Sequence, residues 1–227
     1  MRIALISNMF PPDSDGGLEA NAFKAAHGLR ARGHDVQVLC SRYRKGFVPQ
    51  EREPEWVHRL FRMAPFWSNE WVGLKYKGHF LWALLAETWL LHRNRRVVER
   101  WLQGRSFDAV YCFGMSLIGT GTTLPFSHKG IPVLFHQGGG YLESRYVRHP
   151  VESIFLRLRR RWLRMEDEVD LRHIAYVSQF LMDQGEAVGL FDPPHRGTLT
   201  RTVIPRGVDF VPAEDVAATD RLLSGSG

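Results

Sequence analysis

The chain has 227 residues, of which 44% are hydrophobic, so it can bury a sizeable core as one large or two small domains, and nothing in this composition suggests disorder. Its formal net charge of +6 is a mild bias that suits nucleic acid, anionic lipid or a phosphorylated substrate equally well. The two cysteines, Cys40 and Cys112, each lie in a strand-like apolar run. This pattern predicts buried, reduced thiols in a cytoplasmic compartment and excludes a disulfide framework.

The first strand, loop and helix carry the strongest local signal. Residues 3–6 form a continuous apolar run, as expected for a strand covered on both faces, and the Pro-Pro-Asp segment at 11–13 ends its ladder pairing. Gly16 and Gly17 then precede a helix predicted over residues 18–32. The free N–H groups and the positive dipole end of that helix would suit a diphosphate. The alternative is a loop that needs positive φ and binds no ligand.

The rest of the chain alternates predicted strands with predicted helices. Pro125 is expected to end the helix over 115–124, and Ser178 is expected to cap the short helix that ends near residue 188. Short connections between alternating elements predict a doubly wound, mostly parallel, Rossmann-like α/β fold. The predicted strands are 36–40, 57–61, 108–113, 132–136, 173–177 and 202–204, and the remaining helices are 74–102, 115–124 and 150–170.

Basic and aromatic residues crowd two helical stretches. Residues 80–91 are strongly apolar, but twelve helical residues cover only about 18 Å of the roughly 30 Å hydrocarbon thickness of a bilayer, so no span is predicted. The N-terminus lacks a signal-peptide pattern, and secretion is not expected. The helix over 151–165 is explained either by a core-facing stripe with a solvated basic face or by contact with a membrane surface. The aromatic residues that favour membrane contact are Trp67, Trp71 and Trp89. The basic residues are Arg93, Arg95, Arg96, Arg100, Arg157, Arg159, Arg160, Arg161 and Arg164.

Three motifs, in this order, resemble a known family. They are Asn8-Met9-Phe10-Pro11-Pro12-Asp13 before the glycine pair, Arg32-Gly33-His34-Asp35-Val36 after the helix, and Val177-Ser178-Gln179-Phe180-Leu181 ahead of Val203-Ile204-Pro205-Arg206-Gly207-Val208-Asp209. Together they resemble the N-terminal domain of the family 4 glycosyltransferases. The resemblance implies one half of a GT-B architecture, in which two Rossmann-like domains face each other across a cleft. It also implies retaining transfer from a nucleotide sugar with no cofactor and no bound metal.

The resemblance divides the chain at about residue 210. Residues 1–210 correspond to the acceptor-side domain, and residues 211–227 to a truncated hinge or tail with the C-terminal donor domain absent. We therefore expect a catalytically incomplete chain, either truncated or partnered by a separate chain that carries the donor domain. Arg206 stands where the family usually has asparagine, so the hinge geometry is expected to differ.

The resemblance also implies the site residues. His136 matches the active-site histidine of the family and is expected to hydrogen-bond the reacting sugar rather than to act as a nucleophile. Gly16 and Gly17 are expected to close over the donor diphosphate and the acceptor. Gln137 stands where the family often has aspartate, and Gly138 is expected to bring backbone near the acceptor. The alternatives are a histidine satisfied within the core and a merely flexible glycine loop.

Two functions remain open from the sequence. The first is transfer of a sugar to a glycan or lipid-linked acceptor in polysaccharide biosynthesis, in the cytoplasm or peripherally at the inner face of the membrane. The second is a non-catalytic module that binds a lipid or polysaccharide precursor. The Asp13-Ser14-Asp15 sequence matches a metal-binding pattern that is common by chance in turns, so no metal site is expected. Nucleic acid is not an expected partner, because no reading motif accompanies the net charge.

Overall fold

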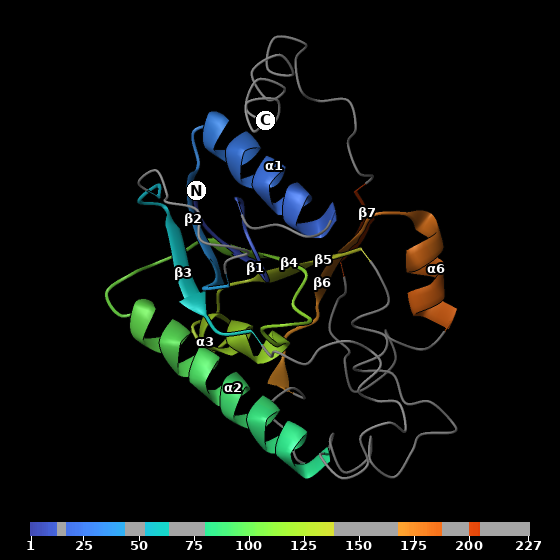
Figure 1. Ribbon diagram of the computed structural model, residues 1–227. Helices are drawn as coiled ribbons and strands as arrows, with labels where there is room; N and C mark the ends of the chain where they lie inside the picture. The colour runs from blue at the N-terminus through green and yellow to red at the C-terminus, as the bar shows by residue number, and fades with distance from the viewer. Residues whose placement is uncertain (13–16, 44–52, 64–79, 139–167, 188–199, 205–227) are drawn as a thin grey trace, which may run out of the picture.

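Figure 1 shows the computed structural model of the chain, which describes residues 1–12, 17–43, 53–63, 80–138, 168–187 and 200–204. The described strands form one seven-stranded parallel sheet in the order β3-β2-β1-β4-β5-β6-β7, which confirms the predicted doubly wound, Rossmann-like fold. The strands are β1 (Arg2–Ser7), β2 (Asp35–Ser41), β3 (Val57–Phe61), β4 (Ala109–Phe113), β5 (Val133–Gln137), β6 (His173–Tyr176) and β7 (Thr200–Val203). The described helices are α1 (Gly17–Ala31), α2 (Phe80–Trp101), the 3-10 turn η3 (Thr120–Thr123), α3 (Leu124–Ser127) and α6 (Gln179–Ala187).

Strand β1 lies inside the sheet, between β2 and β4. Ile3 stands opposite Val36 on one side and Ala109 on the other. The chain runs outward from β1 to β2 and β3, and then returns to β4 and continues outward in the other direction. The strand order therefore reverses between β1 and β4. In open α/β sheets, ligands bind outside the carboxyl ends of the strands at such a reversal.

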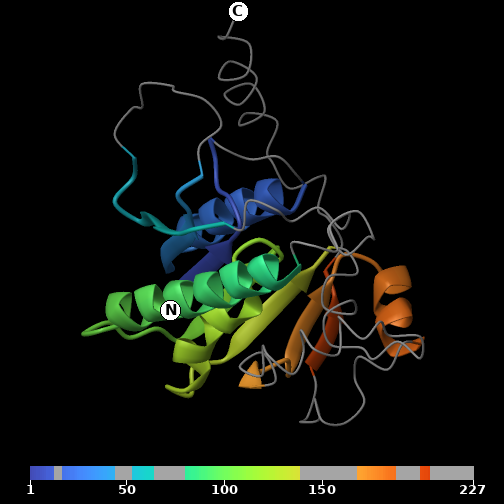
Figure 2. The same cartoon turned by 60° about the horizontal axis from the view of Figure 1, so that its bottom comes forward.

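The two faces of the sheet are covered by different helices. Helix α1 covers one face, and α2 and α3 lie on the other (Figure 1). Figure 2, turned by 60°, shows α1 and α2 on opposite sides of the strands. Ala22 and Ala26 of α1 pack into one buried cluster with Leu5, whereas Val98 and Trp101 of α2 belong to the cluster on the other face. The small alanine side chains let α1 lie close to the strands.

The two cysteines are buried in different hydrophobic clusters, one on each face of the sheet. Cys40 belongs to the cluster beneath α1 and Cys112 to the cluster beneath α2, and neither is part of a disulfide. Burial raises the pKa of the Cys112 thiol well above its usual range. These observations confirm the expectation of buried thiols outside any disulfide.

Most predicted strand bounds agree with the structure within two residues, but the helix predicted over 115–124 is wrong. Gly119 has a φ of 82°, a left-handed conformation that a helix cannot contain. Pro125 lies in the first turn of α3, where its missing N–H costs nothing, so it helps to begin a helix rather than to end one. By contrast, the predicted cap is confirmed, because Ser178 Oγ accepts a hydrogen bond from the Leu181 N–H at 3.4 Å.

Several predictions fall on residues 13–16, 44–52, 64–79, 139–167, 188–199 and 205–227, which lie outside the described residues. They concern Gly16, the Asp13-Ser14-Asp15 sequence, the start of the helix over 74–102, the basic helix from residue 150 and the hinge with Arg206. Within the described ranges, no helix is long and apolar enough to cross a membrane. The same ranges hold no group of three or more His, Cys, Asp or Glu residues suited to a metal ion.

Candidate functional site

The first turn of α1 meets the carboxyl ends of β4 and β5. Helix α1 begins at Gly17, and the side chain of the next residue, Leu18, lies against Gly114 and Gly138. A Cβ added at Gly138 would lie 2.6 Å from Leu18 Cδ2, and one added at Gly114 would lie 3.4 Å from Leu18 Cδ1. Both glycines therefore let the start of α1 come close to the strand ends. This contact brings Gly17 and Gly138, two of the predicted site residues, to one place.

His136 is buried near the end of β5, with 7% of its surface exposed. Its register partner on β4 is Phe113, and the two rings stack with their centroids 4.8 Å apart. Phe113 belongs to the cluster beneath α1, so His136 lies on the α1 face of the sheet. Tyr111 Oη, two residues back along β4, lies 2.8 Å from His136 Nδ1. The imidazole is thus held between an aromatic ring and a phenol.

The contact with Tyr111 links the role of the phenol, as donor or acceptor, to the tautomer of His136. Burial raises the pKa of Tyr111 to about 12, with a smaller contribution from Cys112, so the phenol stays protonated at neutral pH. A phenol that donates to Nδ1 leaves the proton of a neutral imidazole on Nε2. In this arrangement, His136 Nε2 is a hydrogen-bond donor. Sequence reasoning missed Tyr111, because its pairing with His136 depends on the register of β4 against β5.

Replacement of Tyr111 by phenylalanine is expected to release this tautomer preference. With the phenol removed, both neutral forms of His136 become accessible, and the free energy of unfolding falls by about 1 kcal/mol for the lost hydrogen bond. Long-range ¹H–¹⁵N NMR spectra of the imidazole report the tautomer directly. Tyr43→Phe, at a residue that is 45% exposed, is the matched control. Identical imidazole nitrogen shifts in the wild type and Tyr111→Phe would contradict the assignment.

Gln137 leaves β5 on the opposite side from His136. Successive side chains of a strand point to opposite faces, and Phe135, two residues earlier, packs in the cluster beneath α2. Gln137 is 4% exposed, and its carbonyl accepts a hydrogen bond from the Val177 N–H at 3.1 Å. The structure therefore brings His136 and Gly138 toward α1 and directs the Gln137 side chain to the other face.

Asn8 joins the ends of three strands. Its Oδ1 accepts from the Leu117 N–H at 3.0 Å, and its Nδ2 donates to Ser116 Oγ at 3.2 Å, which connects β1 to the loop after β4. Its backbone carbonyl accepts from the Ser41 N–H at 3.1 Å, at the end of β2. Only 3% of Asn8 is exposed. A polar residue directly after a buried strand was the available sequence signal, but its partners were not predictable.

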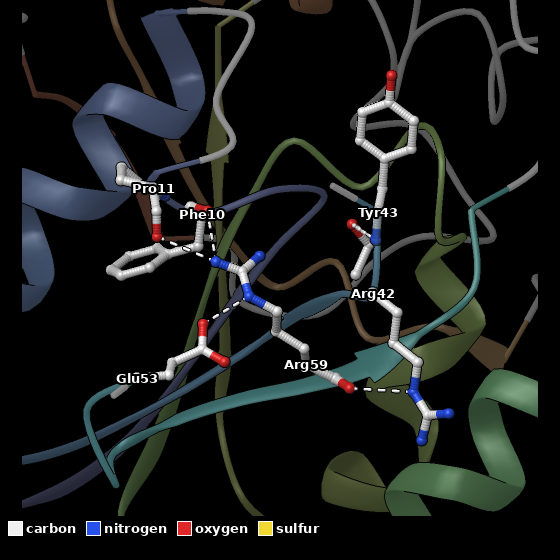
Figure 3. A network of polar contacts seen from close by, with 7 residues as sticks. Phe10, Pro11, Arg42, Tyr43, Glu53 and Arg59 are labelled. Carbon is white, nitrogen blue, oxygen red and sulfur yellow. Dashed lines mark hydrogen bonds and ion pairs between the residues drawn. The ribbon is translucent and has the colours of Figure 1, made fainter. Parts of the chain in front are cut away.

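Arg59 of β3 holds the segment that follows β1, as Figure 3 shows. Its Nη2 donates to the carbonyls of Phe10 at 3.1 Å and Pro11 at 3.0 Å. Its Nε donates to Glu53 Oε1 at 2.5 Å, and the side chain is only 6% exposed. This buried cation therefore anchors Phe10 and Pro11, which follow β1. Sequence reasoning treated residue 59 only as part of a strand.

The fold and this site define a Rossmann-like domain with a helix N-terminus and a buried histidine at the reversal of strand order. Residues 16–196 match the family described as the glycosyl transferase 4-like domain. The chain therefore belongs to this family and carries a glycosyltransferase domain. No curated protein matches the chain.

The solved structure of one GT-B glycosyltransferase, a sucrose-phosphate synthase, shares this fold. Sucrose-phosphate synthase from Thermosynechococcus elongatus has 14% identity and a TM-score of 0.53, and the match covers 97% of this chain and 52% of that one. UGT2 from Phytolacca americana has 14% identity and a TM-score of 0.46, with 97% and 55% covered. MurG from Acinetobacter baumannii has 14% identity and a TM-score of 0.36, with 92% and 68% covered. The chain thus spans about half the length of the synthase that it matches.

Proposed function

We propose that this chain is the acceptor-side half of a retaining glycosyltransferase, which moves a sugar from a nucleotide sugar to a glycan or lipid-linked acceptor. Membership of the glycosyl transferase 4-like family supports glycosyl transfer. The observation that carries the finer proposal is the contact of Leu18 with Gly138, because it sets the first turn of α1 beside the strand end that bears His136. No metal and no cofactor are required in this proposal.

The chemistry of sugar transfer needs both features. The departing diphosphate gains negative charge in the transition state, and preorganised N–H groups at a helix N-terminus stabilise that charge. A neutral His136 with its proton on Nε2 would donate a hydrogen bond to the reacting sugar. Tyr111 would act as a positioning residue, because it touches only the imidazole in this scheme. Gly138 would bring backbone near the acceptor at the same edge.

The proposal assigns donor binding to a second Rossmann-like domain, in the same polypeptide or in a separate one. Coverage of 52% of the sucrose-phosphate synthase chain supports this division, since a GT-B enzyme has two such domains. We further propose that the acceptor belongs to polysaccharide assembly at the inner face of the membrane. The exposed Trp89 beside two arginines supports a lipid-linked acceptor.

Ligand-observed NMR of the purified chain with UDP-, GDP- and dTDP-sugars tests the division of labour. We expect no binding by the chain alone, and turnover once a donor domain completes the enzyme. Clear binding of one nucleotide sugar, or turnover by the chain alone, would show a donor site within these 227 residues and overturn the half-enzyme proposal.

In the completed enzyme, His136→Ala is expected to lower turnover by about a hundredfold or more, because a positioned hydrogen-bonding group is removed from the reacting sugar. His128→Ala is the matched control, since His128 is exposed and precedes β5 at the opposite edge of the sheet. Steady-state assays of both variants against the wild type measure the effect. Equal turnover of His136→Ala and His128→Ala would show that His136 has no role in the active site.

A further inference from the structure

We propose that Arg42, Arg62 and Arg93 form a phosphate-binding site at the carboxyl ends of β2 and β3, beside the exposed ring of Trp89. Its ligand is a phosphate ester or diphosphate, carried either by a lipid headgroup or by a soluble molecule. The site is separate from His136 and lies at the outer strands of the same sheet edge. The inference goes beyond the proposed function and does not depend on it, because binding alone tests it.

Two of the arginines share one aromatic ring. Arg62 Cζ lies 5.8 Å from the centroid of the Trp89 ring, and Arg93 Cζ lies 5.9 Å from the same centroid. Both distances fall within the range of a cation–π contact. Trp89 is 55% exposed, so solvent reaches the ring that gathers these two cations. The ring thus holds the two positively charged guanidinium groups near each other, although their charges repel.

The backbone around these arginines is anchored. Asn94, which is fully buried, accepts from the Arg62 N–H at 3.1 Å and donates to the Arg62 carbonyl at 2.9 Å. This pair of hydrogen bonds fastens the residue after β3 to α2, next to Arg93. Arg42 follows β2, and its Nε donates to the Arg59 carbonyl at 3.1 Å. Figure 3 shows the Arg42 guanidinium directed toward α2.

No carboxylate in the described part of the chain forms an ion pair with Arg42, Arg62 or Arg93. Arg93 Nη1 is buried without a hydrogen-bond acceptor. Burial, followed by the charges of Arg62, Arg42 and Arg100, lowers the pKa of Arg93. A buried N–H donor that lacks an acceptor is unfavourable, and so is a group of three positive charges without a negative charge nearby. A bound anion would supply the acceptor and the missing charge.

Some other arginines in the described part of the chain do pair with carboxylates. Arg95, on the same helix, pairs with Glu99 at 2.8 Å, and Arg59 pairs with Glu53. Arg172 pairs with Asp170 at 2.6 Å. Arg95 therefore offers a nearby arginine whose charge is already compensated, in contrast to Arg93 on the same helix.

The side chains indicate the class of ligand. Guanidinium groups match the geometry of phosphate oxygens and bind them through paired hydrogen bonds. Trp89 adds an amphipathic ring of the kind found at membrane–water interfaces, and Leu85, one helical turn earlier, is 39% exposed. A phosphate on a lipid headgroup would let both apolar side chains contact the interface, whereas a soluble phosphate would use the arginines alone.

Calorimetric titration of the full chain with inorganic pyrophosphate tests the site. We expect binding by the wild type, and a dissociation constant about tenfold higher for each of Arg62→Gln and Arg93→Gln. Arg95→Gln has the same charge change on another side of α2 and is expected to bind as the wild type does. Arg62→Lys and Arg93→Lys are expected to bind more tightly than the glutamine variants. Circular dichroism verifies that each variant is folded.

Failure of the wild type to bind pyrophosphate would overturn the site. Equal weakening by Arg95→Gln and Arg93→Gln would also overturn it, because net charge alone would then explain binding. These outcomes leave the sugar-transfer proposal unaffected, since neither experiment contains a sugar nucleotide.

Sedimentation with vesicles distinguishes the two sources of phosphate. If the ligand is a lipid headgroup, the chain co-sediments with vesicles of phosphatidylcholine mixed with phosphatidylglycerol but not with phosphatidylcholine alone, and pyrophosphate competes. Trp89→Ala then weakens vesicle binding more than pyrophosphate binding. If the ligand is soluble, pyrophosphate binds and neither vesicle retains the chain. Both results support the site, whereas vesicle binding that is insensitive to Arg62→Gln and Arg93→Gln contradicts it.

Discussion

Gly119→Ala is expected to lower the free energy of unfolding by about 3 kcal/mol or more. Gly119 precedes η3 with a φ of 82°, where a left-handed conformation costs an alanine about 1 to 2 kcal/mol. An added Cβ would also overlap Leu91 Cδ2 of α2. Leu91 is 2% exposed and cannot easily move away, so overpacking adds about 1 to 3 kcal/mol.

Gly130→Ala separates these two costs. Gly130 has a φ of 72°, but an added Cβ there meets nothing within 4 Å. Its substitution is therefore expected to cost only the backbone contribution of about 1 to 2 kcal/mol. Urea denaturation of both variants and the wild type gives the comparison. Equal losses at the two positions would mean that Leu91 relaxes freely and that the packing of α2 on η3 is loose.

Arg59→Met is expected to lower the free energy of unfolding by about 2 to 3 kcal/mol. The substitution leaves the Glu53 carboxylate and the carbonyls of Phe10 and Pro11 without their shared cation. Breaking a fully buried ion pair costs about 3 to 5 kcal/mol, and the loss here is smaller because Glu53 is 25% exposed. Faster amide hydrogen exchange of Phe10 is expected as well, since the segment after β1 loses its anchor.

Arg172→Met is the matched control for Arg59→Met. Arg172 also pairs with a carboxylate, that of Asp170, but it is 56% exposed, so its loss is expected to cost less than about 1 kcal/mol. A double variant, Arg59→Met with Glu53→Leu, is expected to recover part of the lost stability, because the carboxylate that loses the Arg59 cation is removed with it. Strictly additive losses in this double-mutant cycle would show that the ion pair between Arg59 and Glu53 contributes nothing to stability. Unchanged hydrogen exchange of Phe10 in Arg59→Met would contradict the anchoring role.

The consequence of Arg59 for the site follows from its place in the chain. Phe10 and Pro11 lead toward the first turn of α1, whose Leu18 contacts Gly138. Anchoring these two carbonyls limits where the helix N-terminus can lie. Arg62 directly follows the same strand, so Arg59 of β3 anchors this segment and the residue after β3 forms part of the proposed phosphate site.

Local sequence patterns were sufficient for the strands and for α1. Buried parallel strands are short, continuous apolar runs, and the run at 3–6 lies within β1. The bounds predicted for the strand over 57–61 agree with β3 at both ends. The helix over 115–124 failed because apolar periodicity does not reveal a left-handed φ at Gly119, which packing against Leu91 of α2 enforces. Pro125 was equally ambiguous, since proline ends one helix and begins another.

For the candidate site, too, some features follow from the sequence and others only from the tertiary structure. The sequence by itself determined the order of strands and helices along the chain, the apolar runs of the core, the glycine pair at residues 16–17 and the family resemblance that singled out His136. These features depend on residues close together in the chain. Only the tertiary structure decided that Tyr111 meets His136, that Asn8 meets Leu117, and that Arg62 and Arg93 share Trp89. Each of these contacts joins residues that are brought together by strand register or helix packing, and their geometry is a property of the assembled sheet rather than of any local segment.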